Sequence, residues 1–186
     1  MKQYRLIKPL FYGSVLTAIL VLSFQVALWS QEMNKSRPLP NVGDRALDFS
    51  LQDFDGKSFT ISEMKNGKAV LLWFTNLCSG CQSKLPFMEE LNKKFRNKEM
   101  EVLAVSQLGK DRETVEDVIR KNNLSVRFLY DPSGEATTLY TGGYNPGTCP
   151  LTNIFLIDKA GKISFATHYP GVSEKELTNQ INELMK

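Results

Sequence analysis

The sequence predicts an α/β sandwich with a mixed central sheet, and three observations support that prediction. Short apolar stretches typical of strands alternate with helical patterns along residues 69–140. Residues 69–74 form an unbroken apolar run, as in a strand buried on both faces. Residues 153–158 and 163–167 are strand-like and are joined by a short polar turn, which predicts an antiparallel hairpin. Strands that alternate with helices and end in a hairpin give a sheet with parallel and antiparallel pairs.

Ahead of the apolar run, residues 48–51 and 58–61 alternate between polar and apolar side chains, and a turn containing Asp55 and Gly56 separates them. This pattern predicts a β-hairpin, followed by a single helical turn at residues 62–65. After the run, apolar side chains recur at helical spacing and predict one helix. Those side chains are Cys81, Leu85, Met88, Leu91 and Phe95.

The rest of the chain continues the alternation. Residues 101–106 and 127–130 are predicted strands, and residues 111–121 and 135–140 are predicted helices. A closing helix is expected over residues 173–185. Ser173 is its predicted N-cap and Glu176 stands three positions later, which is the capping-box pattern.

The N-terminal region is typical of a membrane anchor. Residues 9–29 carry no charge and are mostly apolar, and 21 residues is close to the ~20 needed to span a bilayer. Basic residues precede them, which favours a cytoplasmic N-terminus. We therefore expect a cytoplasmic segment at residues 1–8, an anchor at 9–29, a linker at 30–41 and a folded domain at 42–186 outside the cytoplasm. The alternative is a cleaved signal peptide, whose apolar core is usually shorter, about 7–15 residues.

The charge of the chain does not indicate a nucleic-acid partner. Of its 23 basic and 20 acidic residues, five basic residues and one acid lie before Pro38. The remaining 18 basic and 19 acidic residues give the rest of the chain a net charge of about −1. The overall value of +3 therefore reflects the N-terminal region and not a basic binding surface.

Cys78 and Cys81 enclose Ser79-Gly80 where the buried strand turns into a helix. A thiol at a helix N-terminus faces unpaired N–H groups, which favour its thiolate. We expect Cys78 to be the nucleophile and Cys81 the thiol that resolves the mixed disulfide. A structural disulfide closing so short a loop would constrain the unfolded chain little. A zinc site would need further ligands, for which only Cys149 and His168 remain. No metal or other cofactor is expected.

These residues resemble the thioredoxin superfamily and, within it, the membrane-anchored TlpA-like redoxins of the AhpC/TSA type. The matching features are Thr75 at the end of an apolar strand, the two cysteines, and Pro86 five residues after the second. The resemblance implies a thioredoxin-like fold with an N-terminal β-hairpin and an active-site helix kinked at Pro86. Two departures stand out: Leu77 replaces the usual tryptophan, and Lys84 replaces a glutamate of many cytochrome-maturation members.

The same resemblance implies a cis-proline before the penultimate strand, facing the cysteines and pairing with substrate backbone. Pro150 is the expected residue. Thr152 is the alternative, because it lies three residues before Phe155, which is the family's usual spacing. Cys149 is then either a small buried side chain or a third thiol beside the pair. Lys84 is expected to favour the thiolate form of the active-site cysteines.

The resemblance further implies an extracytoplasmic enzyme, a thiol–disulfide oxidoreductase that reduces protein disulfides, for example in cytochrome c maturation. A membrane thiol carrier would donate its electrons. Two other functions stay open. One is a thiol peroxidase, since Thr75 lies three residues before Cys78, although Leu71 stands where that site has a proline. The other is a non-enzymatic copper or metal chaperone using Cys78, Cys81, Cys149 and His168.

Overall fold

The computed structural model describes residues 38–63, 67–96, 100–107, 112–143 and 149–186. Within them, Leu39–Lys186 form one compact unit. No helix in these ranges is long and apolar enough to cross a membrane. The predicted anchor, residues 9–29, lies outside them, so it stays a prediction.

A mixed sheet forms the centre of the unit, as the sequence predicts, with strand order β2-β1-β5-β4-β3-β6-β7. Strands β3, β4 and β5 are parallel neighbours. On the other side of β3, β6 runs antiparallel to β3, and β7 runs antiparallel to β6. The predicted N-terminal hairpin is also present and joins the sheet through an antiparallel pair between β1 and β5. The strands are β1 (Ser50–Asp53), β2 (Ser58–Thr60), β3 (Ala69–Thr75), β4 (Met100–Ser106), β5 (Arg127–Tyr130), β6 (Ile154–Ile157) and β7 (Ile163–Thr167).

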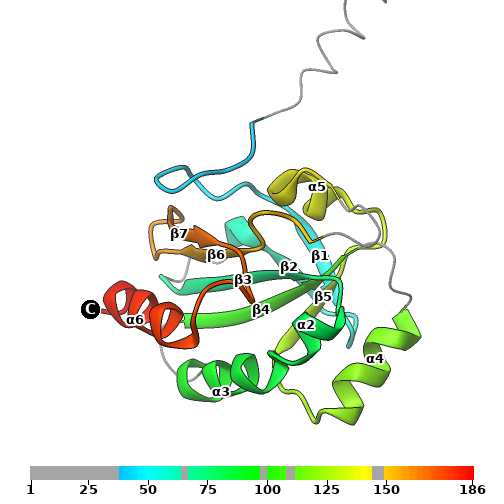
Figure 1. Cartoon of the computed structure of the whole chain (residues 1–186). Coiled ribbons are helices and arrows are strands. Elements are labelled where there is room, and N and C mark those ends of the chain that lie inside the picture. The colour runs from blue at the N-terminus through cyan, green and yellow to red at the C-terminus, as the bar shows by residue number, and fades with distance from the viewer. Residues whose placement is uncertain (1–37, 64–66, 97–99, 108–111, 144–148) are drawn as a thin grey trace, which may run out of the picture. The chain divides into compact units, whose positions relative to one another are not determined.

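Helices cover both faces of this sheet (Figure 1). The two core clusters divide the side chains of β3 by alternate positions, so the strand is buried on both sides. Trp73 packs with the cluster that includes α3 and α6, while Phe74 packs with the cluster that includes α5. The helices are α2 (Ser79–Gln82), α3 (Leu85–Phe95), α4 (Arg112–Lys121), α5 (Glu135–Thr141) and α6 (Glu174–Leu184), with a 3-10 turn η2 at Ile61–Glu63.

The single helix expected over residues 81–95 is instead two helices, α2 and α3. Pro86 explains the break, because a proline lacks an N–H and its ring clashes with the carbonyl four residues earlier. The Lys84 N–H closes a tight turn on the Cys81 carbonyl at 3.0 Å, and α3 then begins with Pro86 in its first turn. The five apolar side chains of the predicted stripe are nevertheless all buried.

The closing helix has the predicted cap. The Ser173 Oγ accepts the N–H of Glu176 at 3.1 Å, and α6 packs its Leu177 and Ile181 side chains into the core. The loop between β7 and α6 contains a cis peptide bond at Tyr169–Pro170. Pro170 packs on the first turn of α2, since a Cβ added at Gly80 would lie 3.8 Å from its Cγ atom.

A buried carboxylate fixes α3 against the segment that leads into β5. Glu89, whose side chain is 8% exposed, accepts the N–H groups of Ser125 at 2.7 Å and Val126 at 3.1 Å. It also accepts the Ser125 hydroxyl at 2.6 Å and pairs with Lys93. Burial alone would raise the pKa of Glu89, but these partners lower it below its ordinary value of 4.5. The helix that follows the cysteines is therefore held through an ionised side chain.

We expect Glu89→Gln to lower the free energy of unfolding at neutral pH by about 1–3 kcal/mol. Both N–H groups bind Oε2, so the amide oxygen can keep them, but an NH2 group then replaces the oxygen that accepts the Ser125 hydroxyl and pairs with Lys93, and the negative charge is lost. A lowered folded-state pKa stabilises the fold above the unfolded pKa and loses that effect as pH falls through the folded value. The difference between wild type and variant should thus shrink below pH 4.5. Urea unfolding of both proteins at several pH values measures this difference in the free energy of unfolding. A difference that stays the same from neutral to acidic pH would contradict the prediction.

Candidate active site

The cysteines follow a sharp corner between β3 and α2 that two short side chains build. Thr75 Oγ1 accepts the N–H of Leu77 at 3.1 Å, and Asn76 Oδ1 accepts the N–H of Cys78 at 3.0 Å. Each bond spans two residues, the pattern by which Thr and Asn side chains form turns. Leu77 adopts a left-handed backbone with φ of 52°. Its carbonyl accepts the Gln82 amide at 2.7 Å, which ties the corner to the end of α2.

Cys78 is the N-cap residue of α2 and is partly exposed. Its sulfur lies 3.5 Å from that of Cys81. Partial burial acts to raise the pKa of Cys78, but the Cys81 N–H, the Cys81 and Cys149 thiols and the Gly80 N–H bond to its sulfur. These interactions outweigh burial and lower the pKa below the ordinary value of 9.0. Cys78 therefore has the properties of an attacking thiol.

Cys81 lies one turn further on and is only 1% exposed. Burial raises the pKa of Cys81 to about 12, although the Thr75 hydroxyl opposes the shift, and the negative charge of Cys78 adds to it. The Cys81 thiol faces Asn76 Oδ1 at 3.8 Å. The two thiols of the motif are thus distinct, one favouring its thiolate and the other keeping its proton.

Cys149 lies beside this pair. Its thiol lies near enough to the Cys78 and Cys81 sulfurs and to Asn76 for the four groups to influence one another's pKa values. The residue is exposed. Partial burial of the sulfur and the charge of Cys78 raise the pKa of Cys149. The structure therefore brings all three cysteines of the chain together, with Asn76 touching each.

The expectation that Pro150 is the cis-proline is wrong, because the Cys149–Pro150 bond is not cis. Thr152 remains at the place that the family spacing indicates, half-buried before β6. Cys149 is nevertheless beside Cys78, so its position does not depend on a cis bond. The Pro150 carbonyl lies 2.9 Å from Nδ1 of His168, and this contact ties the loop to the end of β7.

Asn153 provides a second anchor for that loop. Its Nδ2 donates to the Tyr169 carbonyl at 2.8 Å and its Oδ1 accepts the Tyr169 N–H at 2.7 Å. Leu151, between the two anchors, is 93% exposed. The loop thus presents one large apolar side chain to solvent two residues from Cys149.

The structure shows a partner for Lys84 outside the thiol pair. Its Nζ binds Glu174 Oε1 at 3.0 Å and lies 5.9 Å from the ring centroid of Tyr169. The expected effect of Lys84 on the thiols assumed one continuous helix, whereas the chain turns between α2 and α3. Lys84 therefore links α3 to the start of α6.

His168 does not join the thiols in a metal site. Its Nδ1 is engaged by the Pro150 carbonyl. Throughout the part of the chain that the structure describes, no three or more His, Cys, Asp or Glu side chains are arranged to hold a metal ion. The metal-chaperone interpretation thus lacks a donor set in the described residues.

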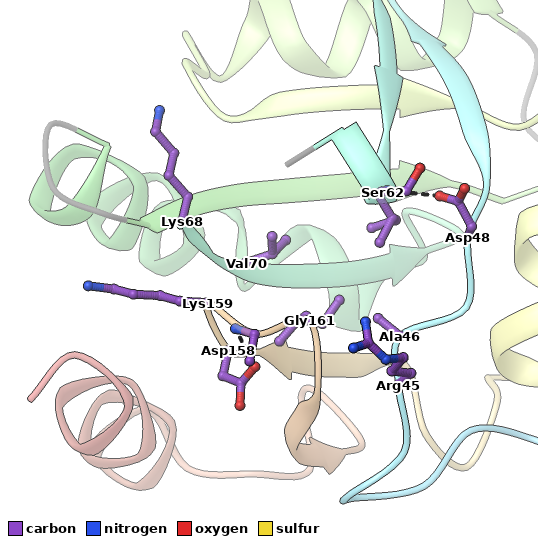
Figure 2. Close-up of a pocket in the computed structure, with 12 residues that line it drawn as sticks. Arg45, Ala46, Asp48, Ser62, Lys68, Val70, Asp158, Lys159 and Gly161 are labelled. Carbon is purple, nitrogen blue, oxygen red and sulfur yellow. Dashed lines mark hydrogen bonds between the residues drawn. The ribbon is translucent and has the colours of Figure 1, made fainter. Parts of the chain in front are cut away.

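A cavity of about 360 Å³ opens at the other end of β3 (Figure 2). Lys68 and Val70 at the start of the strand line it, so roughly 20 Å of strand separates it from the cysteines. Its two carboxylates are engaged in backbone contacts: Asp48 accepts the Ser62 N–H, and Asp158 accepts two N–H groups of its own turn. This cavity is therefore separate from the thiol site.

Sequence reasoning missed two residues of the site. Asn76 could have been found, because an asparagine two residues before a helix N-cap is a turn-forming signal. Tyr169 could not, since it meets Cys81 only through the fold. Its ring packs edge-on against Trp73 with centroids 5.9 Å apart. The Tyr169 hydroxyl is buried and has no hydrogen-bond partner among the residues that the structure describes. Burial, with Glu174 and Cys81 nearby, raises the pKa of Tyr169.

We expect Asn76→Asp to raise the pKa of Cys78, because a carboxylate beside the sulfurs opposes the thiolate. Alkylation by iodoacetamide, followed by peptide mapping over a pH series, should label Cys78 first in the wild type. In the variant, the rate profile for Cys78 should move to higher pH. Lys84→Gln is the control and should leave the profile unchanged. A shift in Lys84→Gln, or none in Asn76→Asp, would contradict this geometry.

Comparison with known proteins agrees with this fold and site. The AhpC/TSA family matches residues 42–166. The thiol-disulfide oxidoreductase ResA of Bacillus thuringiensis is 32% identical over 123 residues. The matched segment is 66% of each chain, so this chain spans just under two thirds of the length of that relative. The ResA of Halalkalibacterium halodurans is 26% identical over 81% of this chain and 80% of its own.

A solved structure shows the same architecture. It is a putative thiol:disulfide interchange protein, DsbE, from Chlorobium tepidum, with a TM-score of 0.65 and 27% identity. The match covers 79% of this chain and 99% of that one. The expected thioredoxin-like fold is thereby confirmed. The chain belongs to the AhpC/TSA family, as a redoxin of the thioredoxin superfamily similar to thiol–disulfide oxidoreductases.

Proposed function

We propose that this protein is a thiol–disulfide oxidoreductase in which Cys78 attacks and Cys81 resolves. The observation that carries the proposal is the contrast within one pair of sulfurs 3.5 Å apart. The pKa of Cys78 is lowered, whereas that of Cys81 is raised to about 12. A structural disulfide or two inert buried thiols would need no such contrast.

In the first step, the Cys78 thiolate attacks one sulfur of a substrate disulfide. The substrate S–S bond breaks, one substrate thiolate leaves, and a mixed disulfide joins Cys78 to the substrate. The attacking sulfur is accessible because Cys78 is partly exposed at the helix start. Cys81 keeps its proton during this step, so it does not compete for the substrate.

In the second step, Cys81 attacks Cys78 Sγ, the substrate leaves as its second thiolate, and a Cys78–Cys81 disulfide remains. The first step itself favours this attack. The negative charge of Cys78 is one cause of the high pKa of Cys81, and the mixed disulfide removes that charge. Deprotonation of Cys81 therefore becomes easier once a substrate is attached.

A protein or peptide is the substrate class that the surface supports. Leu151 is almost wholly exposed in the loop that carries Cys149. An exposed apolar side chain beside an accessible thiolate suits an extended polypeptide that carries a disulfide. The relatives' names, thiol-disulfide oxidoreductase and thiol:disulfide interchange protein, agree with this class.

We further propose that the enzyme acts outside the cytoplasm, on the reducing side. The apolar residues 9–29 and the basic residues before them support a membrane anchor with an external domain. A membrane thiol carrier would then return two electrons to the Cys78–Cys81 disulfide. Apocytochrome c is a substrate that the family resemblance suggests.

The activity is tested with the full-length protein in detergent, by reduction of insulin disulfides at the expense of dithiothreitol. Cys78→Ser should fall to the uncatalysed rate, because no attacking thiolate remains. Cys81→Ser should form mixed disulfides with insulin chains, visible on non-reducing gels. Lys84→Gln is the matched control and should keep wild-type turnover. Turnover in Cys78→Ser would refute the assignment.

The anchor is tested by membrane fractionation. Full-length protein should stay in the membrane pellet after a sodium carbonate wash, because a spanning helix is not released by high pH. Replacing Leu16 and Leu20 with Asp should move it into the supernatant, since each charge is costly at the bilayer centre. Recovery of wild type as a soluble chain beginning near Gln31 would show cleavage instead.

A further inference from the structure

We propose that Cys149 is a second resolving thiol, able to close a Cys78–Cys149 disulfide in place of the Cys78–Cys81 disulfide. The inference deepens the proposed function and rests on the attack by Cys78. It concerns how the mixed disulfide is released, and it gives a role to the third cysteine of the chain.

The first support is the placement of the three sulfurs. The Cys149 thiol lies near enough to the Cys78 and Cys81 sulfurs to interact with both of them. Cys78 is therefore flanked by two thiols, one from its own helix and one from the loop before β6. Disulfide formation requires such side-chain contact across a short backbone separation.

The second support is the anchoring of the loop. The contact between His168 and the Pro150 carbonyl fixes the residue next to Cys149. Asn153, four residues on, is held to Tyr169 by two hydrogen bonds. The sulfur is thus presented to Cys78 from a segment tied to the end of β7 and the loop that follows.

The third support is the difference in access between the two candidates. Cys81 is 1% exposed on the buried side of α2, whereas Cys149 is exposed. Both have a raised pKa with burial as the main cause. Loss of the Cys78 charge in the mixed disulfide relieves the part of that shift that the charge causes in each of them.

The chemistry balances as an ordinary thiol–disulfide exchange. The Cys149 thiolate attacks Cys78 Sγ of the mixed disulfide, the bond from Cys78 to the substrate breaks, and the substrate leaves as a thiolate. The substrate disulfide gains two electrons, and the Cys78 and Cys149 thiols lose them. Cys81 keeps its proton throughout. The resulting disulfide has one sulfur at the surface, where an external thiol can reach it.

The test isolates Cys149 by using full-length Cys81→Ser protein and one equivalent of dithionitrobenzoate. Attack by Cys78 releases the first thionitrobenzoate. Attack by Cys149 on the adduct then releases the second and leaves a Cys78–Cys149 link for peptide mapping. We expect both products in this variant. Cys81→Ser/Cys149→Ser should release only the first and retain the adduct on Cys78.

Cys78→Ser/Cys81→Ser controls for direct reaction of Cys149 with the reagent and should react more slowly in the first phase. A persistent Cys78 adduct in Cys81→Ser, or a first phase no faster than in this control, overturns the inference. Cys81→Ala repeats the experiment if circular dichroism shows that the serine variant is misfolded. Insulin reduction by the wild-type protein separates the two proposals. If the wild type does not reduce insulin but Cys81→Ser still forms the Cys78–Cys149 disulfide, the proposed function alone is overturned.

Discussion

The site depends on the two side-chain-to-backbone hydrogen bonds at the end of β3. Thr75 and Asn76 each accept the N–H two residues ahead, and in doing so they turn a fully buried strand into a helix within three residues. Without these acceptors, two N–H groups at the edge of the core would lack partners, at a cost of about 1–3 kcal/mol each. The same corner places Cys78 at a helix start and directs its sulfur toward the N–H groups of α2. Backbone geometry and thiol chemistry therefore have a common origin.

Burial makes two similar residues chemically different. Cys78 and Cys81 are three positions apart, so they share one side of the first turn of α2. One sulfur lies at the rim and receives hydrogen bonds, while the other lies over Tyr169 and the core. The charge on the first raises the pKa of the second, so the order of the two chemical steps is set by their coupling. Asn76 accepts the backbone N–H of Cys78 and lies beside the Cys81 and Cys149 thiols, so it serves both the corner and the chemistry.

Much of the scaffold is predictable from sequence because its signals are local. The apolar run at residues 69–74 identifies β3, and the Ser173 cap with Glu176 identifies the start of α6, since each feature depends on neighbouring residues. The cysteine pair at a strand-to-helix junction also follows from the chain itself. The apolar stripe continues across the break between α2 and α3, so periodicity alone predicts one helix, and only Pro86 and the family resemblance indicated a kink there.

Other parts of the site depend on contacts that sequence does not show. Lys84 was expected to act on Cys81, but its partner is Glu174, ninety residues further along the chain. Pro150 was expected to be cis from family spacing, whereas its carbonyl contacts His168 at the end of a later strand. Tyr169 reaches the cysteines only because Asn153 holds its backbone. Each of these positions is determined by the packing of distant segments.

The packing around Gly80 leaves the dipeptide between the cysteines free to vary. A Cβ there would meet Pro170 at 3.8 Å and the Cys78 sulfur at 3.9 Å, both ordinary contact distances, and Ser79 is exposed. The corner that positions the sulfurs is built by the side chains of Thr75, Asn76 and Gln82, and it uses no side chain of the intervening dipeptide. Substitutions at Ser79 and Gly80 can therefore change the driving force of electron transfer while leaving the sulfur positions intact. Evolution or an engineer can thus retune this protein as a donor or an acceptor without rebuilding its scaffold.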